Sequence, residues 1–264
     1  VRGKGRSMGD LEFDDVVFGY GGSLLFDGFS ASFPKGSISC IVGPNGCGKS
    51  TLAKLAMGLV RPTSGRVRVA GRDVSSLAAR DRARLLGVLV QQQEAPMMTA
   101  RELVVCGRFP CCGSFSRLSR ADEERIDEAL SLAGVSELRD RSLRSLSGGQ
   151  RQRVRMAMVL AQDTPIVLLD EPTSFMDVAA CFDMVRLIRQ VRQRGKTVVA
   201  VIHDLNLALS VADQVFVMER GRLAAQGEPT DGRVRGAIEQ SFGVRLEHVR
   251  ASYGTAWVPF ELRE

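Results

Sequence analysis

The sequence predicts an α/β fold with a mostly parallel sheet, and three observations lead to this prediction. Short apolar runs alternate with segments of helical spacing along most of the chain, which is typical of strands joined by helices. A glycine-rich loop at residues 43–50 separates a buried-strand pattern from a helical pattern. Residues 92–145 show no clear strand pattern, and we therefore expect a helical subdomain inserted into the α/β core.

The elements of the first half follow from apolar runs and turn residues. Apolar runs predict strands at residues 11–18, 38–42, 67–69 and 86–90, of which residues 38–42 form the second strand of the chain. A helical pattern covers residues 50–59 and ends before a proline. Thr99 and Glu102 have the spacing of a capping box, so a helix should begin there. Residues 121–133 again show helical spacing.

The second half returns to the α/β pattern. We expect helices at residues 149–161 and 177–194, the second ending at a glycine. Residues 166–169 form a short apolar run, and residues 197–202 form a β-branched one, so both predict central strands. Two further runs joined by a Glu-Arg-Gly turn predict a hairpin at residues 215–218 and 222–225. The last thirty or so residues have no clear pattern.

Length and charge limit the possible classes of protein. The chain has 264 residues, enough for a single domain over residues 1–264. We divide it into a core of residues 8–91 and 146–264 and a helical subdomain of residues 92–145. The net charge of +6 fits a nucleic acid, an anionic membrane surface or a phosphate ligand, and also an ordinary arginine-rich surface.

Cysteine and apolar content describe the expected environment. The six cysteines show no C-x₂-C spacing, so we expect free thiols in a reducing cytosol rather than a zinc site. No apolar stretch reaches the roughly 18–20 residues that span a bilayer. If the protein works at a membrane, other chains must supply the membrane part.

The glycine-rich loop has the chemistry of a nucleotide-binding site. It reads GPNGCGKS and fits G-x-x-x-x-G-K-[ST], with a strand before it and a helix after it. Its glycines allow backbone N–H groups to surround phosphates, and the helix N-terminus adds partial positive charge. We call residues 43–50 the phosphate loop, and we expect contacts to ATP from Gly43, Pro44, Asn45, Gly46, Cys47, Gly48, Lys49, Ser50 and Thr51. In this interpretation Lys49 contacts the β- and γ-phosphates, and the Ser50 hydroxyl binds Mg²⁺.

Two carboxylates follow the predicted strand at residues 166–169. Ligands of parallel α/β sheets bind at the carboxyl ends of strands, where Asp170 and Glu171 should emerge. A carboxylate is a preferred Mg²⁺ ligand, so Asp170 is the candidate metal residue. Glu171 is the candidate base for the attacking water.

A second candidate anion site lies at residues 146–150, which read LSGGQ. Ser147 offers a hydroxyl, Gly148 and Gly149 free the backbone, and a helix begins there, with Gln150 in its first turn. In a chain with a phosphate loop and an Asp-Glu strand, this segment resembles the signature of ABC ATPases, and we call it the signature loop.

The resemblance covers nearly the whole chain and is strongest to ATPase subunits of ferric-siderophore, haem and cobalamin importers. It is supported by residues 99–110 (TARELVVCGRFP), 146–162 (LSGGQRQRVRMAMVLAQ) and 201–207 (VIHDLNL). By resemblance, Tyr20 stacks on adenine, Gln91 binds Mg²⁺ and senses the γ-phosphate, and His203 is the switch histidine. Residues 174–177 (SFMD) resemble the family's D-loop. An N-terminal antiparallel β region is also implied.

The resemblance further implies partners and a mechanism. Two copies form a homodimer in which each ATP, with Mg²⁺, lies between the phosphate loop of one copy and the signature loop of the other. The catalytic set is Lys49, Gln91, Glu171 and His203. Two transmembrane permease subunits and, indirectly, a substrate-binding protein complete an importer at the cytoplasmic face of the bacterial inner membrane. No nucleic acid is expected.

Several alternatives stay open at this stage. The transported chelate is ferric siderophore by first preference, with haem or cobalamin as alternatives. An exporter subunit, an ABC-type ATPase acting on nucleic acid, and a phosphate-loop protein without a transport role are the other candidates. The sequence shows no long coiled coil, no zinc spacing and a single phosphate loop, which disfavours the nucleic-acid class.

Overall fold

The computed structural model describes residues 9–90, 95–112, 117–174, 176–252 and 254–261. Its central sheet has the strand order β10-β9-β3-β8-β7-β6. All neighbouring strands are parallel except β9 and β10, which form the expected hairpin. The strands are β3 (Ile38–Val42), β6 (Leu86–Leu89), β7 (Ile166–Asp170), β8 (Thr197–Val201), β9 (Gln214–Glu219) and β10 (Arg222–Gly227). The predicted α/β fold with a mostly parallel sheet is therefore confirmed.

An antiparallel sheet at the N-terminal side lies beside the central one. Its strands are β1 (Leu11–Tyr20), β2 (Ser23–Phe33), β4 (Ser64–Val69) and β5 (Arg72–Asp73), in the order β2-β1-β4-β5. The prediction that Ile38–Val42 is the second strand was wrong, because β2 precedes it. The β1/β2 ladder shifts register several times, and Gly28 has a φ of +74°. These irregularities break the alternation of apolar residues that would have identified β2.

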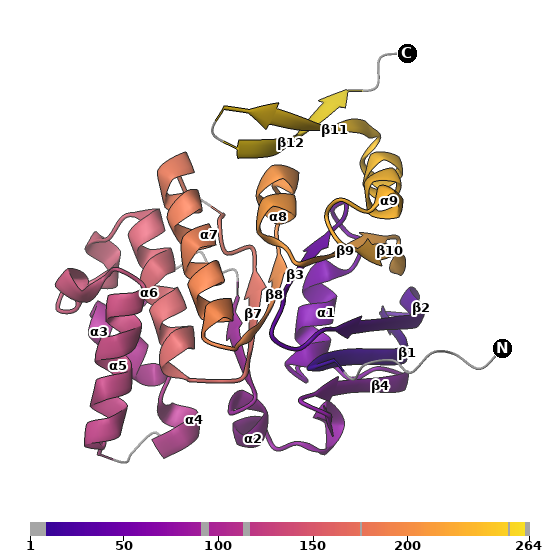
Figure 1. Cartoon of the computed structure of the whole chain (residues 1–264). Coiled ribbons are helices and arrows are strands. Elements are labelled where there is room, and N and C mark those ends of the chain that lie inside the picture. The colour runs from indigo at the N-terminus through magenta and orange to yellow at the C-terminus, as the bar shows by residue number, and fades with distance from the viewer. Residues whose placement is uncertain (1–8, 91–94, 113–116, 175, 253, 262–264) are drawn as a thin grey trace.

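The two faces of the central sheet have separate cores (Figure 1). Alternate residues of β8 show this, since Val198 and Ala200 belong to one core and Val199 to the other. The first core contains residues of α3 (Ala100–Cys106), α5 (Arg120–Leu132), α6 (Gly148–Ala161), α7 (Val178–Gln193), α8 (Leu205–Val211) and α9 (Gly232–Phe242). The second contains residues of α1 (Lys49–Ala56) and the antiparallel sheet.

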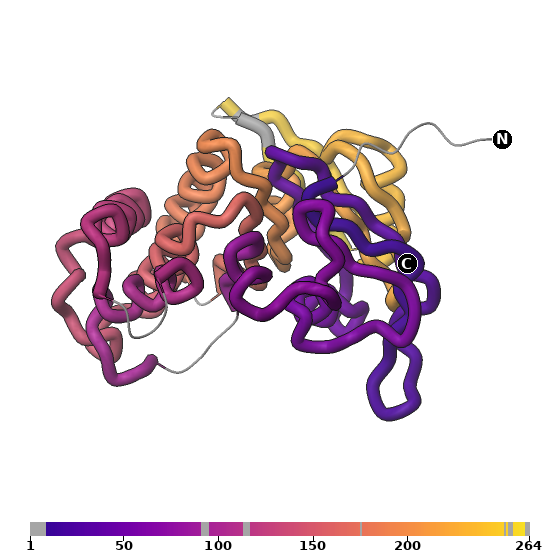
Figure 2. The backbone as a smooth tube through the Cα atoms, turned by 90° about the horizontal axis from the view of Figure 1, so that it is seen from below, coloured from indigo at the N-terminus to yellow at the C-terminus, as the bar shows by residue number. Residues whose placement is uncertain are grey.

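The described part of residues 92–145 contains helices and turns and no β-strand. Helices α3, α4 (Phe109–Cys112), α5 and α6 gather at one end of the molecule in both views (Figures 1 and 2). Thr99 caps α3 through the predicted capping box with Glu102. Arg108, just before α4, pairs with Asp122 of α5 at 2.9 Å and donates to the carbonyl of Ala161 at the end of α6 at 2.7 Å.

The remaining elements are short or C-terminal. Helix α1 ends at Ala56, earlier than the pattern over residues 50–59 indicated, because Gly58 adopts a left-handed φ of +64°. The short elements are α2 (Ala79–Ala83) and the 3₁₀ turns η1 (Val74–Ser76), η2 (Ser136–Leu138) and η3 (Leu143–Ser145). A hairpin of β11 (Val244–Ala251) and β12 (Gly254–Glu261) packs on α8, where Trp257 N–H donates to Asn206 Oδ1 at 3.0 Å.

Two global features bear on the sequence-based expectations. In the described part of the chain the cysteines are free thiols, and no cluster of His, Cys, Asp and Glu side chains is suited to a metal ion. None of the helices in the described ranges combines the length and the apolar character needed to cross a bilayer.

Candidate nucleotide-binding site

The candidate site residues meet at the carboxyl ends of three adjacent strands. The phosphate loop follows β3, Asp170 is the last residue of β7, and His203 lies two residues beyond β8. Because β3, β8 and β7 are parallel neighbours, these ends lie side by side. The structure therefore brings together the loop, the two carboxylates and the histidine that the sequence singled out separately.

Lys49 is buried inside the phosphate loop. Its ammonium donates to the carbonyl of Gly43 at 2.7 Å and to that of Pro44 at 2.9 Å. The side chain is therefore folded beneath the loop, with its charge held at the place where the loop can surround a phosphate.

Two glycines of the loop are required by close packing. A Cβ atom on Gly43 would lie 2.3 Å from the carbonyl oxygen of Met218 in β9. Gly48 caps α1 with a left-handed φ of +112°, and a Cβ there would lie 2.6 Å from the ring of Phe26 in β2. The N-cap Gly48 offers no side chain to the start of α1, so the first N–H groups of this helix are suited to bind an anion.

Asp170 is a buried carboxylate with an unpaired oxygen. Its Oδ1 is buried and has no hydrogen-bond partner among the residues that the structure describes. Burial raises the pKa of Asp170, and the neighbouring Glu171 raises it further, whereas the hydroxyl of Ser50 opposes this shift. A carboxylate oxygen of this kind beside a serine hydroxyl is a donor set that fits Mg²⁺.

Glu171 is held in one orientation. Its φ of +55° is unusual for a residue other than glycine, and its N–H donates to the carbonyl of Val201 at 3.1 Å. Oε2 accepts from the Ser174 hydroxyl at 2.8 Å, and Oε1 lies 2.6 Å from Nε2 of His203. Burial alone would raise the pKa of Glu171, but the hydrogen bonds from Ser174 and His203 outweigh it and the pKa is lowered. The carboxylate is therefore ionised near neutral pH.

The signature loop forms the start of α6. Ser147 is the N-cap and accepts from the N–H of Gln150 at 3.2 Å, while Gln150 Oε1 accepts from the N–H of Ser147 at 3.0 Å. This reciprocal capping box is a structural role that sequence reasoning missed, although the S-x-x-Q spacing carries its signal. Ser147 is exposed, and α6 contributes to the opposite core from α1. The signature loop and the phosphate loop therefore lie on different faces of the sheet.

The other predicted residues have mixed outcomes. Tyr20 ends β1 and is 47% exposed, so its ring is open to a ligand, and its stacking on adenine stays a prediction. Within the D-loop segment, Asp177 caps α7 by accepting from Ala180 N–H at 2.8 Å. Gln91 and Phe175 lie outside the described residues.

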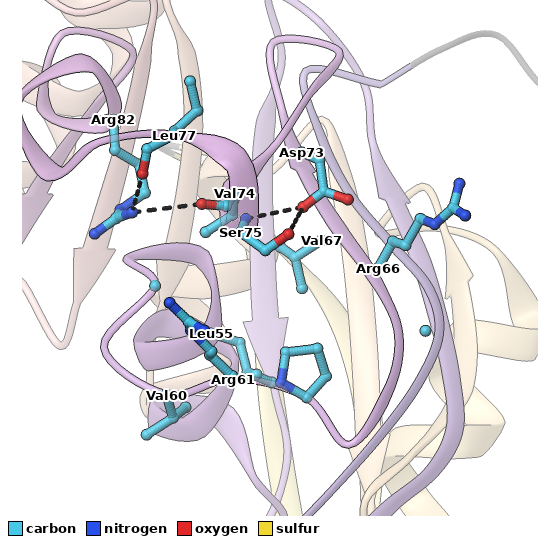
Figure 3. Close-up of a pocket in the computed structure, with 13 residues that line it drawn as sticks. Leu55, Val60, Arg61, Arg66, Val67, Asp73, Val74, Ser75, Leu77 and Arg82 are labelled. Carbon is cyan, nitrogen blue, oxygen red and sulfur yellow. Dashed lines mark hydrogen bonds between the residues drawn. The ribbon is translucent and has the colours of Figure 1, made fainter.

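A cavity of about 150 Å³ lies away from this site, between the end of α1 and β4 (Figure 3). Arg82 on its wall donates to the carbonyl of Leu77 at 2.9 Å, and Asp73 accepts from Ser75 N–H at 2.8 Å. These two polar groups are therefore paired within the protein.

The fold and the site define a nucleotide-binding α/β protein of the phosphate-loop type. The family model described as "ABC transporter" matches residues 26–174. This range includes the phosphate loop, the signature loop and both carboxylates. The chain belongs to the ABC transporter family, and it is an ATPase of that family.

Curated relatives and solved structures agree with this assignment. The chain is 38% identical over 242 residues to the ferric enterobactin transport ATP-binding protein FepC of Escherichia coli (strain K12), covering 91% of this chain and 89% of that protein. It is 36% identical to the iron(3+)-hydroxamate import ATP-binding protein FhuC of Bacillus subtilis (strain 168), covering 92% and 91%. A metal-chelate type ABC transporter in an inward-facing conformation aligns with a TM-score of 0.82 at 26% identity, covering 95% of this chain and 97% of that one.

Proposed function

We propose that this chain is the ATP-hydrolysing subunit of an importer for a metal chelate, with ferric siderophore as the substrate. The observation that supports this best is the similarity over about nine-tenths of the chain to ATP-binding proteins whose names specify ferric siderophore transport. The chemistry of the site supports the assignment as an ATPase independently, because the ammonium of Lys49 and the carboxylates of Asp170 and Glu171 lie together at the phosphate loop.

The proposed reaction is the in-line attack of water on the γ-phosphorus of ATP, which breaks the bond to the bridging oxygen and releases ADP and inorganic phosphate. Lys49 neutralises charge on the phosphates from inside the loop. Glu171, which is ionised, accepts a proton from the attacking water, and His203 contacts the γ-phosphate together with Gln91. Positioning and electrostatics provide most of the catalysis in such transfers.

A magnesium ion completes the proposed site. Ser50 and the unpaired oxygen of Asp170 would hold it, with Gln91 as a further ligand, and the ion would neutralise charge on the β- and γ-phosphates. The unpaired oxygen of Asp170 supports this role, and a cation there would oppose the burial and the Glu171 charge that raise the pKa of this carboxyl.

The proposed assembly is a homodimer that shares two ATP molecules. In one chain, the phosphate loop and the signature loop belong to opposite faces of the sheet. A single nucleotide that contacts both types of loop would therefore lie between two copies of the chain. A bacterial ABC transporter cassette solved as a dimer, with a TM-score of 0.73 and 26% identity, supports this arrangement.

The proposed docking surface for two permease subunits lies beside Gln91, in residues 94–110. Met97 is 82% exposed there, and a cavity of about 320 Å³ is lined by apolar side chains of α2, β6 and the segment after α1, including Leu59, Ala83 and Val88. Apolar side chains that are open to solvent in one place favour a protein contact. The chain would then bind the cytoplasmic face of the bacterial inner membrane through its permeases, with a substrate-binding protein acting indirectly.

The test is substrate-stimulated ATP hydrolysis. The chain is reconstituted in proteoliposomes with the permease and binding protein encoded beside it, and phosphate release is measured with a ferric siderophore, haem or cobalamin. We expect stimulation by the ferric siderophore and ATP-dependent uptake of iron. Stimulation by haem or cobalamin alone would contradict the siderophore assignment, and no response to any of the three would contradict metal-chelate import.

A further inference from the structure

Ser174 contacts Glu171 twice. It lies three residues further along the chain, in the turn between β7 and α7, and its hydroxyl donates to Glu171 Oε2 at 2.8 Å. Its backbone N–H donates to the carbonyl of Glu171 at 3.3 Å. The side chain and the backbone of Ser174 thus both donate to Glu171, the residue that we propose as the base.

The two oxygens of the carboxylate are held from different elements. His203, which follows β8, lies 2.6 Å from Oε1, while Ser174 holds Oε2 from the turn after β7. A carboxylate with one such contact can still rotate about its terminal bond, whereas contacts to both oxygens fix the plane of the group. Ser174 therefore supplies the orientation that His203 alone does not.

The turn that carries Ser174 is itself anchored on α7. The thiol of Cys181 lies 3.7 Å from the carbonyl oxygen of Thr173 and 3.9 Å from that of Met176, on either side of the turn. The first turn of α7 also lies close to the first turn of α6, since a Cβ added to Gly149 would lie 3.4 Å from the Cβ of Ala180. Helix α7 thus contacts both the turn that carries Ser174 and the start of α6.

We propose that Ser174 is a positioning residue, which fixes the plane of the Glu171 carboxylate for attack by water. The inference rests on the proposed role of Glu171 as the base. It predicts an effect on the chemical step rather than on ATP binding, since among the described residues the hydroxyl of Ser174 bonds to Glu171 whereas Lys49 bonds to carbonyls of the phosphate loop.

The test compares Ser174→Ala and Ser174→Thr in the full chain, each with and without Glu171→Gln, by steady-state hydrolysis of Mg·ATP. Ser174→Ala should lower kcat about tenfold with little change in KM, because orientation of the base is lost while binding is kept. Ser174→Thr keeps a hydroxyl and should restore most of kcat. Ser210→Ala is the matched control, since its hydroxyl also donates to an oxygen three residues back in the chain, in this case the backbone carbonyl of Leu207, outside the site.

Two results would overturn the inference while the ATPase assignment stands. One is an unchanged kcat for Ser174→Ala beside an active wild type. The other is an equal further loss when Ser174→Ala is added to Glu171→Gln, which would mean that the hydroxyl acts independently of the carboxylate. If the wild-type chain itself hydrolysed no ATP, the proposed function would fail first, and the positioning role with it. Thermal melting and ATP binding, measured on each variant, separate a folding defect from a loss of chemistry.

Discussion

Replacement of Glu171 by glutamine is the most direct test of the proposed chemistry. The amide has nearly the same size as the carboxylate, and its oxygen can still accept one of the hydrogen bonds from Ser174 and His203. It cannot accept a proton from water. A general base contributes about 10²–10⁴ to rate, so turnover should fall by about that factor, which raises the barrier by about 2.7–5.4 kcal/mol at 1.36 kcal/mol per tenfold change.

The assay is release of inorganic phosphate from Mg·ATP, measured beside equilibrium binding of ATP. Binding should stay within a few-fold of wild type, because Lys49 and the phosphate loop are untouched. Glu137→Gln serves as the control, since this exposed glutamate of η2 lies in the helical subdomain. Near-normal turnover in Glu171→Gln would refute the assignment of the base.

Three further predictions concern binding and stability. Lys49→Met should weaken ATP binding by at least about tenfold, measured by isothermal titration, because it removes the buried cation of the phosphate loop. Gly43→Ala should destabilise the fold by about 1–3 kcal/mol in urea unfolding, since its Cβ meets a carbonyl oxygen of β9, whereas Gly236→Ala in open space should not destabilise it. Arg108→Met should cost about 3–5 kcal/mol, because it leaves Asp122 buried without its cation. The pKa of Asp122 is lowered in the folded chain by Ser119 and, to a smaller degree, by Arg108. In wild type, the contribution of Asp122 to stability is therefore full above the ordinary carboxyl pKa and is lost as pH falls through the folded value. Urea midpoints across this pH range that show no such loss would contradict the prediction.

The parts of the fold that the sequence predicted have strong local signals. Strands β3, β7 and β8 are buried on both faces, so they appear as continuous apolar runs. Helices α3 and α6 start at the N-caps Thr99 and Ser147, whose capping-box partners lie only three residues further along the chain. Much of the candidate site was predictable for the same reason, since the phosphate loop, Asp170–Glu171 and His203 lie at or just beyond the end of such a strand.

The parts that the sequence did not predict depend on contacts between distant segments. Strand β2 was missed because its ladder with β1 is irregular, and the C-terminal hairpin owes its place to the packing of Trp257 on α8. Position 48 requires glycine because a Cβ there would meet the ring of Phe26 in β2, and this contact cannot be predicted from the sequence of the loop. The bond from Ser174 to Glu171 needs the turn after β7, whose shape is set by α7 rather than by the motif.

The central claim is that two copies of this chain share each ATP between a phosphate loop and a signature loop. Sedimentation of the Glu171→Gln chain with Mg·ATP tests it directly. We expect a dimer that contains two ATP molecules and that dissociates when ATP is removed. Ser147→Arg in the same background should remain a monomer while each chain still binds ATP. A dimer that forms equally well with Ser147→Arg would contradict the claim.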